Sequence, residues 1–203
     1  MEYVQERVTT LHDFGSAAPA APTDRATVVV PMTERDHASL AAERVFATLE
    51  QVDPANVLVA LRATPEEVGD VAAWLDGFDV PTEVLWCSAP PLAEYLQSAG
   101  LDGPTGKGRD VWLALGVAAA ETDLIAVHDA DAESYAATHV PRLLFPLGEG
   151  YAFSKGYYAR VENDRLYGRL NRLFYVPLVR ALADAHDAPV VEYLAAFRYA
   201  LAG

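Results

Sequence analysis

Short apolar runs alternate with amphipathic stretches between residues 26 and 129. The apolar runs are rich in Val and Leu and end at polar or turn-forming residues, which is typical of buried strands; they cover 26–31, 56–61, 82–87 and 123–129. The stretches between them carry apolar residues at helical spacing, and the predicted helices cover 37–52, 64–78, 91–100 and 109–121. This alternation predicts an α/β fold, with a mostly parallel sheet that helices cover on both faces.

The pattern changes after residue 150, and the stretch before residue 25 differs from both. Alternating aromatic residues predict a strand, and two amphipathic stretches predict helices, the first of them kinked at Pro177; the elements are the strand 151–161 and the helices 166–186 and 189–203. Residues 16–24 are small and rich in proline, which is typical of a linker. We therefore expect an N-terminal arm and linker over 1–24 and one folded domain over 25–203.

Composition and charge narrow the classes of function. The chain has 203 residues, of which 52% are hydrophobic, and this favours a globular protein over a disordered one. Its net charge of -14 is the wrong sign for a protein that binds the phosphate backbone of nucleic acids. Only Lys107 and Lys155 of the 15 basic residues are lysines. An acidic surface with little lysine resembles the proteins of salt-loving microbes, in which salt screens the self-repulsion; a GC-rich genome is the alternative explanation.

The expected location is the cytoplasm, without a membrane partner. The longest apolar run, residues 111–120, is far shorter than the roughly 20 residues that a membrane span needs. Residues 1–15 lack the basic and apolar segments of a signal peptide. Cys87 is the one cysteine and cannot form an internal disulfide, which fits a reducing compartment.

Two carboxylates, Asp129 and Asp131, follow the apolar run 123–129. Side chains two residues apart on a strand share a face, so both would point to the edge of the sheet where ligands bind in such folds. Like charges in proximity favour a nearby cation, and oxygen ligands suit Mg²⁺ or Mn²⁺, which also bridge phosphates. In the alternative interpretation one Asp caps a helix from Glu133 onward and the other is solvated.

Basic residues at three places predict binding of anions. Lys107 stands between two glycines just before a predicted helix, where backbone N–H groups, the helix dipole and an ammonium would meet an anion; Lys155 is also followed by glycine. Arg165, Arg169 and Arg172 have helical spacing and would share one face that grips carboxylate or phosphate. The alternatives are a surface loop for the lysines and pairing with nearby acidic residues for the arginines. Together the motifs suggest transfer from a nucleotide-activated donor to an anionic acceptor.

In order and content these motifs resemble the GT-A-fold glycosyltransferases related to glucosyl-3-phosphoglycerate synthase and mannosyl-3-phosphoglycerate synthase. The matching segments are VVVPMTE (28–34), GKGRDVWLAL (106–115), VHDADA (127–132), SKGYYAR (154–160) and YGRLNRL (167–173). The resemblance implies a Rossmann-like GT-A domain, with a nucleotide-binding part over 25–132 and the start of an acceptor-binding part over 150–203. It also implies a retaining, Mg²⁺- or Mn²⁺-dependent transfer of a sugar, with glucose expected. The donor would be a nucleotide-diphosphate sugar and the acceptor a phosphorylated small molecule such as 3-phosphoglycerate. The family's products are precursors of compatible solutes, which agrees with a salt-adapted composition.

The resemblance further implies roles for individual residues. Pro31 and Glu34 would edge the nucleotide pocket, Lys107 would bind the nucleotide or its phosphates, and Asp129 would contact the ribose side. Asp131, with Asp129 beside it, would hold the metal. The acceptor would be gripped by Gly168, Arg169 and Asn171. The expected catalytic residues are thus Asp131, Lys107 and Arg169.

The chain departs from the family in two respects. The acidic, glycine- and serine-rich turn that follows the family's second strand is replaced by ALRATPEE (60–67). The family also continues further and supplies a histidine metal ligand that none of the five histidines here matches, so we expect the domain to be incomplete at its C-terminal end. The alternatives to a transferase are a nucleotidyltransferase and a non-catalytic module that binds nucleotide sugars. A haloacid-type phosphatase is disfavoured because Glu133 stands where its motif needs threonine. Helices after residue 166 could pair two chains into a homodimer.

Overall fold

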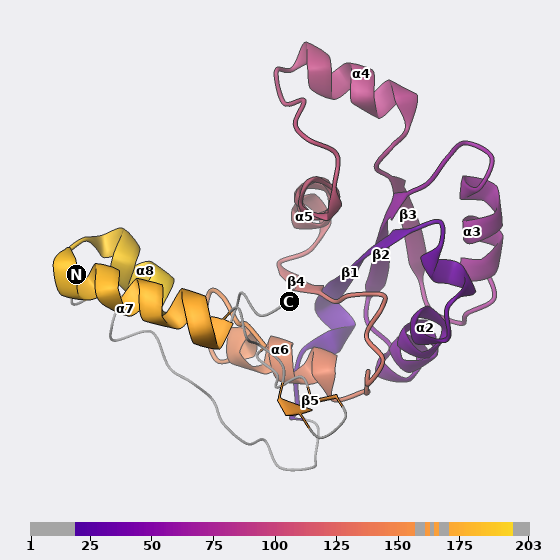
Figure 1. The fold of residues 1–203 in the computed structure, drawn as a ribbon. Helices are drawn as coiled ribbons and strands as arrows, with labels where there is room; N and C mark the ends of the chain where they lie inside the picture. The colour runs from indigo at the N-terminus through magenta and orange to yellow at the C-terminus, as the bar shows by residue number, and fades with distance from the viewer. Residues whose placement is uncertain (1–18, 157–160, 163–164, 167–170, 197–203) are drawn as a thin grey trace. The chain divides into compact units, whose positions relative to one another are not determined.

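The computed structural model describes residues 19–156, 161–162, 165–166 and 171–196. The chain divides into two compact units, one made of residues 12–152 and the other of residues 1–11 with 153–203. The first unit contains the parallel sheet and the second contains the last helices (Figure 1).

A four-stranded parallel sheet forms the centre of the first unit, as the sequence predicts. Its strands are β1 (Ala26–Thr33), β2 (Asn56–Arg62), β3 (Thr82–Trp86) and β4 (Leu124–Val127), in the order β3-β2-β1-β4. The central strand β1 is almost entirely buried because it pairs on both sides. The crossover from β3 to β4 passes over β1 and β2, so the chain reverses its direction of winding between β1 and β4. In sheets of this kind a crevice opens at the carboxyl ends of the strands beside that reversal.

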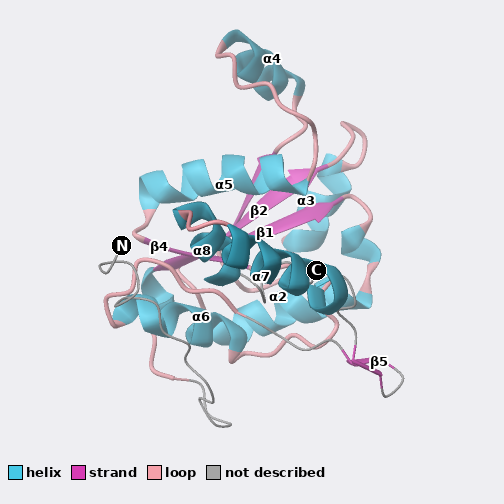
Figure 2. Ribbon diagram, turned by 60° about the vertical axis from the view of Figure 1, so that its left-hand side comes forward, coloured by secondary structure: helices cyan, strands magenta, loops and turns pink. Residues whose placement is uncertain are grey.

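Helices cover both faces of the sheet (Figure 2). On one face, α2 (Leu40–Val52), α3 (Val68–Leu75) and α6 (His139–Gly148) pack on the larger core through side chains such as Phe46 and Leu144, both fully buried. On the other face, α5 (Lys107–Glu121) packs through Ala114 and Ala118, whose small side chains let the helix lie close to the strands. The short helix α4 (Pro90–Ser98) begins with two prolines, which suit the first turn of a helix because its N–H groups need no helical partner.

Local polar groups fix where several elements begin and end. Ser39 caps α2 by accepting a hydrogen bond from the Ala42 backbone N–H at 3.1 Å, and Asp53 ends the helix in the left-handed conformation with φ 51°. Short 3-10 helices, Thr23–Arg25 and Asp36–Ala38, flank β1. Within the predicted linker, Ala21 packs against the larger core.

The structure of the first unit differs from the sequence analysis in the start of one helix and in the segment after β4. The helix predicted from residue 64 begins at Val68, because Thr64 and Glu67 form a turn with a side-chain hydrogen bond of 3.0 Å. No helix begins at Glu133: the next helix, α6, starts at His139. The sequence did not reveal α6, because its two prolines, Pro141 and Pro146, oppose a helical prediction.

The second unit departs further from the prediction. Residues 151–156 form no strand; instead β5 (Val161–Glu162) pairs antiparallel with β6 (Arg165–Leu166). Of the helix predicted over 166–186, the described part begins with Leu166 in β6, continues as a π-helical turn, η3 (Asn171–Tyr175), and becomes α-helical in α7 (Val176–Ala185). The helix predicted from residue 189 is present as α8 (Pro189–Ala196). Pro177 lies in the first turn of α7 rather than at a kink, since proline loses no helical hydrogen bond there. The prediction that Arg165, Arg169 and Arg172 share one helical face is therefore wrong, because Arg165 lies in strand β6.

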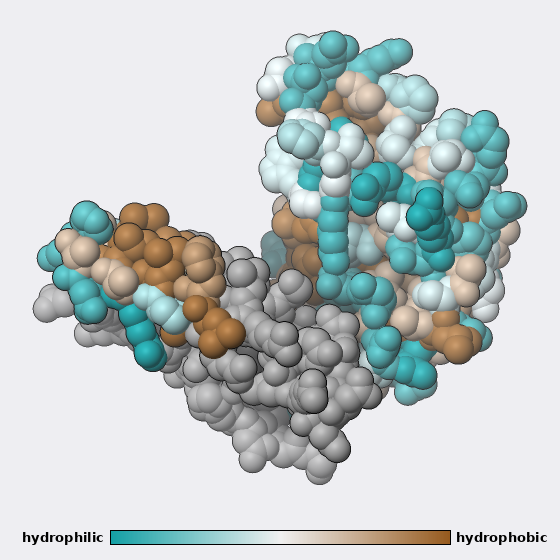
Figure 3. All heavy atoms as spheres, viewed as in Figure 1, coloured by the Kyte–Doolittle hydropathy of each residue, from teal (hydrophilic) through white to brown (hydrophobic). Residues whose placement is uncertain are grey.

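Apolar side chains gather on the surface of the second unit (Figure 3). In η3, α7 and α8 the exposed ones are Leu173, Phe174, Leu178 and Val190. In the described part of the chain, no helix combines the length and the apolar character that crossing a membrane requires.

Candidate functional site

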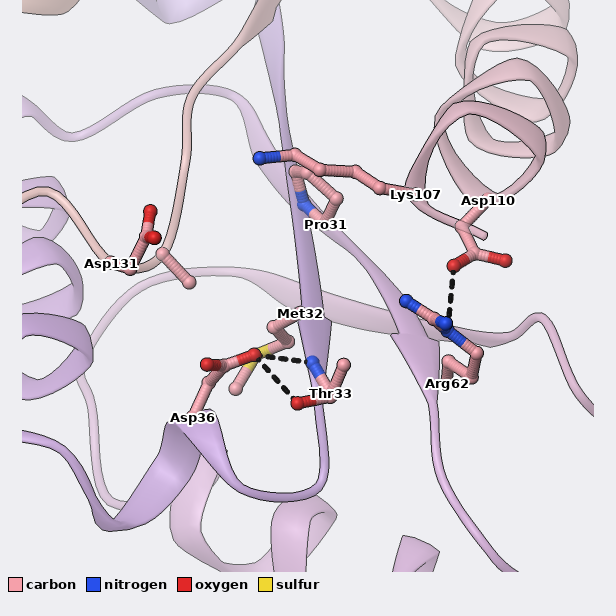
Figure 4. A pocket seen from close by; sticks show the side chains of 9 residues that line it. Pro31, Met32, Thr33, Asp36, Arg62, Lys107, Asp110 and Asp131 are labelled. Atoms are coloured by element: carbon pink, nitrogen blue, oxygen red, sulfur yellow. Dashed lines mark hydrogen bonds and ion pairs between the residues drawn. The ribbon is translucent and has the colours of Figure 1, made fainter. Parts of the chain in front are cut away.

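A cavity of about 150 Å³ opens at the carboxyl edge of the sheet, within the first unit (Figure 4). It lies at the ends of β1 and β2, between the start of α5 and the loop that follows β4, where the fold predicts a ligand crevice. The residues that line it are Pro31, Met32, Thr33, Asp36, Arg62, Lys107, Asp110, Ala130 and Asp131. Figure 4 shows Asp131 and Asp36 on one side of β1, with Arg62 and Asp110 on the other.

Lys107 joins the start of α5 to the loop after β4. Its Nζ lies 2.8 Å from Oδ1 of Asp129, and both side chains are more than half exposed, at 54% and 55%. Asp131, two residues further along the loop, lines the same cavity as Lys107. An exposed ion pair of this kind contributes about 0–1 kcal/mol to stability, so its value to the fold is small. The arrangement provides one exposed ammonium and two carboxylates beside a cavity.

The carboxylates fit one mode of binding a divalent cation. In the parts of the chain that the structure describes, no group of three or more His, Cys, Asp or Glu residues could enclose a metal ion. Mg²⁺, however, is commonly bound through one or two carboxylates together with the phosphate oxygens of a substrate. Asp131 offers its carboxylate to the cavity, whereas Asp129 is held by Lys107. These residues therefore suit a cation that binds together with a diphosphate. They suit less well a cation that protein ligands alone would enclose.

Arg62 and Asp110 form an ion pair on the other wall. Arg62 ends β2 and Asp110 lies in the first turn of α5, with 3.1 Å between Arg62 Nε and Asp110 Oδ2. Asp110 is only 2% exposed. Burial raises the pKa of its carboxyl, while Arg62 and Arg109 act in the opposite direction. Its second oxygen, Oδ1, is buried and has no hydrogen-bond partner among the described residues.

The residues behind this pair hold α5 against β3. Arg109 Nη2 donates to the carbonyl oxygen of Cys87 at 3.2 Å, just after β3. Burial raises the pKa of the Cys87 thiol to about 12, and the Asp110 carboxylate adds to the shift. A thiol with so high a pKa stays protonated at neutral pH and makes a poor nucleophile. Cys87 is thus part of the wall and not of the chemistry.

The loop after β1 shapes the floor of the cavity. Asp36 Oδ2 accepts hydrogen bonds from the Thr33 backbone N–H at 2.5 Å and from Thr33 Oγ1 at 3.0 Å. The Glu34 N–H donates to the carbonyl oxygen of Arg62 at 3.2 Å, which ties this loop to the end of β2. Pro31 lines the cavity, as predicted for the nucleotide edge, whereas half-buried Glu34 lies in the turn outside the lining residues.

His128 is buried directly before the loop that carries Asp129 and Asp131. It is 8% exposed, and its backbone N–H donates to the carbonyl oxygen of Val29 at 3.0 Å. Its ring and that of Tyr135 form a T-shaped pair with 5.2 Å between centroids. Burial lowers the pKa of His128 to about 4, with His139 adding to the effect and Asp129 opposing it. His128 is therefore neutral at physiological pH and leaves the charge of Asp129 to Lys107.

The structure brings some predicted site residues together and leaves others apart. Pro31, Lys107 and Asp131 line one cavity, and Asp129 contacts Lys107. Asn171 begins η3 in the second unit, and Gly168 and Arg169 lie outside the described residues. The sequence did not single out Arg62 or Asp110 as site residues. A signal existed for Asp110, since it shares the buried stripe of α5 with residues four and eight positions further on, Ala114 and Ala118.

The chain is similar in sequence to two proteins that share one enzyme name. The chain is 32% identical to a glucosyl-3-phosphoglycerate synthase from Methanococcoides burtonii, in an alignment of 223 residues that covers 100% of this chain and 55% of that protein. It is 40% identical to a glucosyl-3-phosphoglycerate synthase from Persephonella marina over 157 residues, covering 72% of this chain and 39% of that one. The chain is a homologue of glucosyl-3-phosphoglycerate synthases. It spans about half the length, or less, of these two synthases.

Two further comparisons add little to this homology. No family model matches the chain. Among solved structures, it is similar to 4-diphosphocytidyl-2C-methyl-D-erythritol synthase from Anaerococcus prevotii, with a TM-score of 0.48 and 11% identity over 85% of this chain and 83% of that one. A likeness at that level supports no argument about function.

Proposed function

We propose that the chain is a glycosyltransferase that moves a sugar from a nucleotide-diphosphate sugar to a phosphorylated small molecule. The expected sugar is glucose and the expected acceptor is 3-phosphoglycerate, as the names of the homologous synthases suggest. The observation that supports this most directly is that Lys107 and Asp131 line one cavity at the carboxyl edge of the sheet, with Asp129 in contact with Lys107. That edge is where parallel α/β sheets bind nucleotides.

The donor would occupy the first unit. Residues 25–132 form the proposed nucleotide-binding part, in which Pro31 lines the pocket and Glu34 follows it in the turn. Asp131 would hold Mg²⁺ or Mn²⁺ together with the donor's diphosphate, and Asp129 would lie beside it on the ribose side. Lys107 would exchange its contact with Asp129 for a phosphate oxygen, which is feasible because the pair is exposed and weak.

The chemical step breaks the bond between the sugar's anomeric carbon and the diphosphate oxygen. The acceptor's hydroxyl oxygen bonds to that carbon on the face that the diphosphate leaves, and its proton passes to the departing diphosphate oxygen, so the step balances and the configuration is retained. A divalent cation, when bound, neutralises the negative charge that develops on the departing diphosphate. Lys107 adds a second positive charge at the same place, and a fixed charge is most effective where the transition state gains charge.

The acceptor would be gripped by residues of the second unit. This proposal rests only on the resemblance of the segment YGRLNRL (167–173), which contains Gly168, Arg169 and Asn171. The acceptor-binding part would begin near residue 150. An arginine can bind carboxylate or phosphate through two parallel hydrogen bonds, which would fix the acceptor's orientation. Correct placement of two reactants can lower a barrier by several kcal/mol, roughly 7–11 at best.

One incubation separates this proposal from its rivals. The chain, at high salt with Mn²⁺, is mixed with UDP-glucose and 3-phosphoglycerate, and parallel reactions receive UTP with glucose 1-phosphate. Release of UDP together with a new α-linked anomeric signal by NMR supports glycosyl transfer. Release of pyrophosphate in the parallel reaction means a nucleotidyltransferase. Saturable Mn²⁺-dependent binding of UDP-glucose without either product means a binding module.

The second unit also supports a proposal about assembly. The exposed apolar side chains of η3, α7 and α8 form a surface that could pair two chains into a homodimer. Sedimentation of the wild type and of Phe174→Ser would test this, because a dimer through this surface should weaken in the variant.

A further inference from the structure

One side chain of α2 reaches the acidic loop, residues 129–135. The loop contains turns but no helix or strand. Arg44 Nη1 donates a hydrogen bond to the carbonyl oxygen of Glu133. Among the described residues, no other side chain forms a hydrogen bond with the backbone of this loop. The bond joins segments that lie 89 positions apart in the sequence, so it ties α2 to the loop that carries Asp131.

The helix that carries Arg44 is fixed in the core. The next two residues, Val45 and Phe46, are fully buried, and Thr48 Oγ1 donates to the Arg44 carbonyl oxygen at 2.7 Å. The Arg44 side chain itself is exposed. In the part of the chain that the structure describes, it forms no ion pair, although the chain has 29 acidic residues. The guanidinium thus extends from a rigid backbone to a carbonyl oxygen rather than to a carboxylate.

Packing fixes the acidic loop near both of its ends. Ala130 and Tyr135 are buried in the larger core, and the Tyr135 ring stacks on that of His139 with 5.2 Å between centroids. Asp131, next to Ala130, is exposed and lines the cavity. The contact at Glu133 holds the exposed stretch between Asp131 and Tyr135.

The contact matters more for geometry than for stability. A hydrogen bond at an exposed position contributes little to the fold, because water can replace either partner. Supporting contacts must nevertheless hold the side chains of a binding site to within about 0.5 Å of their working positions. Mg²⁺ in particular demands a nearly ideal octahedral arrangement of oxygens. Since Glu133 lies two residues after Asp131, a shift of its backbone would move the Asp131 carboxylate as well.

We propose that Arg44 is a positioning residue, which holds the acidic loop so that Asp131 can bind a divalent cation together with a diphosphate. This rests on the proposed function, because it assumes that cation. Arg44 acts through the Glu133 carbonyl and does not line the cavity. A lysine at position 44 can donate to the same carbonyl, whereas an apolar side chain of similar length cannot.

The test measures the binding of UDP with Mn²⁺, and of uridine, by calorimetric titration into the full chain. Arg44→Met removes the donor and keeps the length of the side chain, and Arg44→Lys keeps a donor. The matched control is Arg180→Met, at an exposed arginine of α7 in the second unit. Arg44→Met is also combined with Asp131→Ala, because residues that act through one another have effects that do not add.

In the wild type we expect Mn²⁺ to tighten the binding of UDP. In Arg44→Met the affinity for UDP with Mn²⁺ should fall about tenfold, the scale of one hydrogen bond from a charged group, while the affinity for uridine and the melting temperature change little. Arg44→Lys should recover most of the loss, and Arg180→Met should show none. When Asp131 is already alanine, Arg44→Met should weaken binding by less than about twofold.

Three results would overturn the inference while leaving the proposed function intact. The first is an Arg44→Met variant that binds UDP with Mn²⁺ as tightly as the wild type does. The second is an equal loss of affinity for UDP and for uridine, which would assign Arg44 a general structural role. The third is the same loss with and without Asp131. If Mn²⁺ does not tighten the binding of UDP to the wild type, the proposed function and the inference fail together.

Discussion

The ammonium nitrogen of Lys107 lies 2.8 Å from a carboxylate oxygen of Asp129, across the gap between the start of α5 and the loop after β4. The contact joins two motifs that lie apart in the sequence, and Asp131 lines the cavity beside them. Because both members of the pair are more than half exposed, a ligand phosphate can replace Asp129 as the partner of Lys107 at small cost.

Replacing Lys107 should weaken binding of the diphosphate rather than of the nucleoside. In Lys107→Gln we expect the affinity for UDP with Mn²⁺ to fall about tenfold, since a charge-assisted hydrogen bond is lost, while the affinity for uridine stays the same. Calorimetric titration of the two ligands measures this, and Arg25→Gln, at an exposed basic residue of the 3-10 helix Thr23–Arg25, is the control. Equal losses for uridine and UDP would show that Lys107 does not meet the phosphates.

Acid should destabilise the fold through His128. Its pKa is lowered from 6.5 to about 4, so the folded state binds fewer protons than the unfolded state below pH 6.5. Stability is therefore present above pH 6.5 and is lost as the pH falls toward 4, by about 3 kcal/mol for this group. In His128→Phe, which keeps a ring against Tyr135, this loss should be absent from urea unfolding at pH 7 and pH 4. His186→Phe, at an exposed position, should retain it; identical pH profiles for the wild type and His128→Phe would contradict the assignment.

Cys87 should resist alkylation in the folded protein. With its pKa raised from 9.0 to about 12, the thiolate fraction at pH 8.5 is about a thousandfold lower than in the unfolded chain. Iodoacetamide labelling followed by mass spectrometry should therefore be at least about a hundredfold slower in buffer than in urea. Since Asp110 contributes to the shift, Asp110→Asn should label somewhat faster. Labelling at the same rate in buffer and in urea would show that the thiol is not buried as described.

The sheet could be predicted because each of its strands corresponds to a short apolar run in the sequence. Residues 26–31 and 56–61 fall inside β1 and β2, and the motifs that follow strands reach the same edge by topology. The two-residue strands β5 and β6 are too short for a periodic pattern, and prolines concealed α6. The ion pair of Arg62 and Asp110 depends on a contact between distant segments, which residue spacing cannot reveal.

The central claim is that a divalent cation at Asp131 joins the chain to a sugar-bearing diphosphate. The most direct test is the Mn²⁺-dependent rise in melting temperature on addition of UDP-glucose, measured in molar KCl for the wild type, Asp131→Ala and Asp102→Ala, an exposed acid outside the cavity lining. We expect a rise in the wild type and in Asp102→Ala, and none in Asp131→Ala. An equal rise in Asp131→Ala, or a rise in the wild type that does not depend on Mn²⁺, would contradict it.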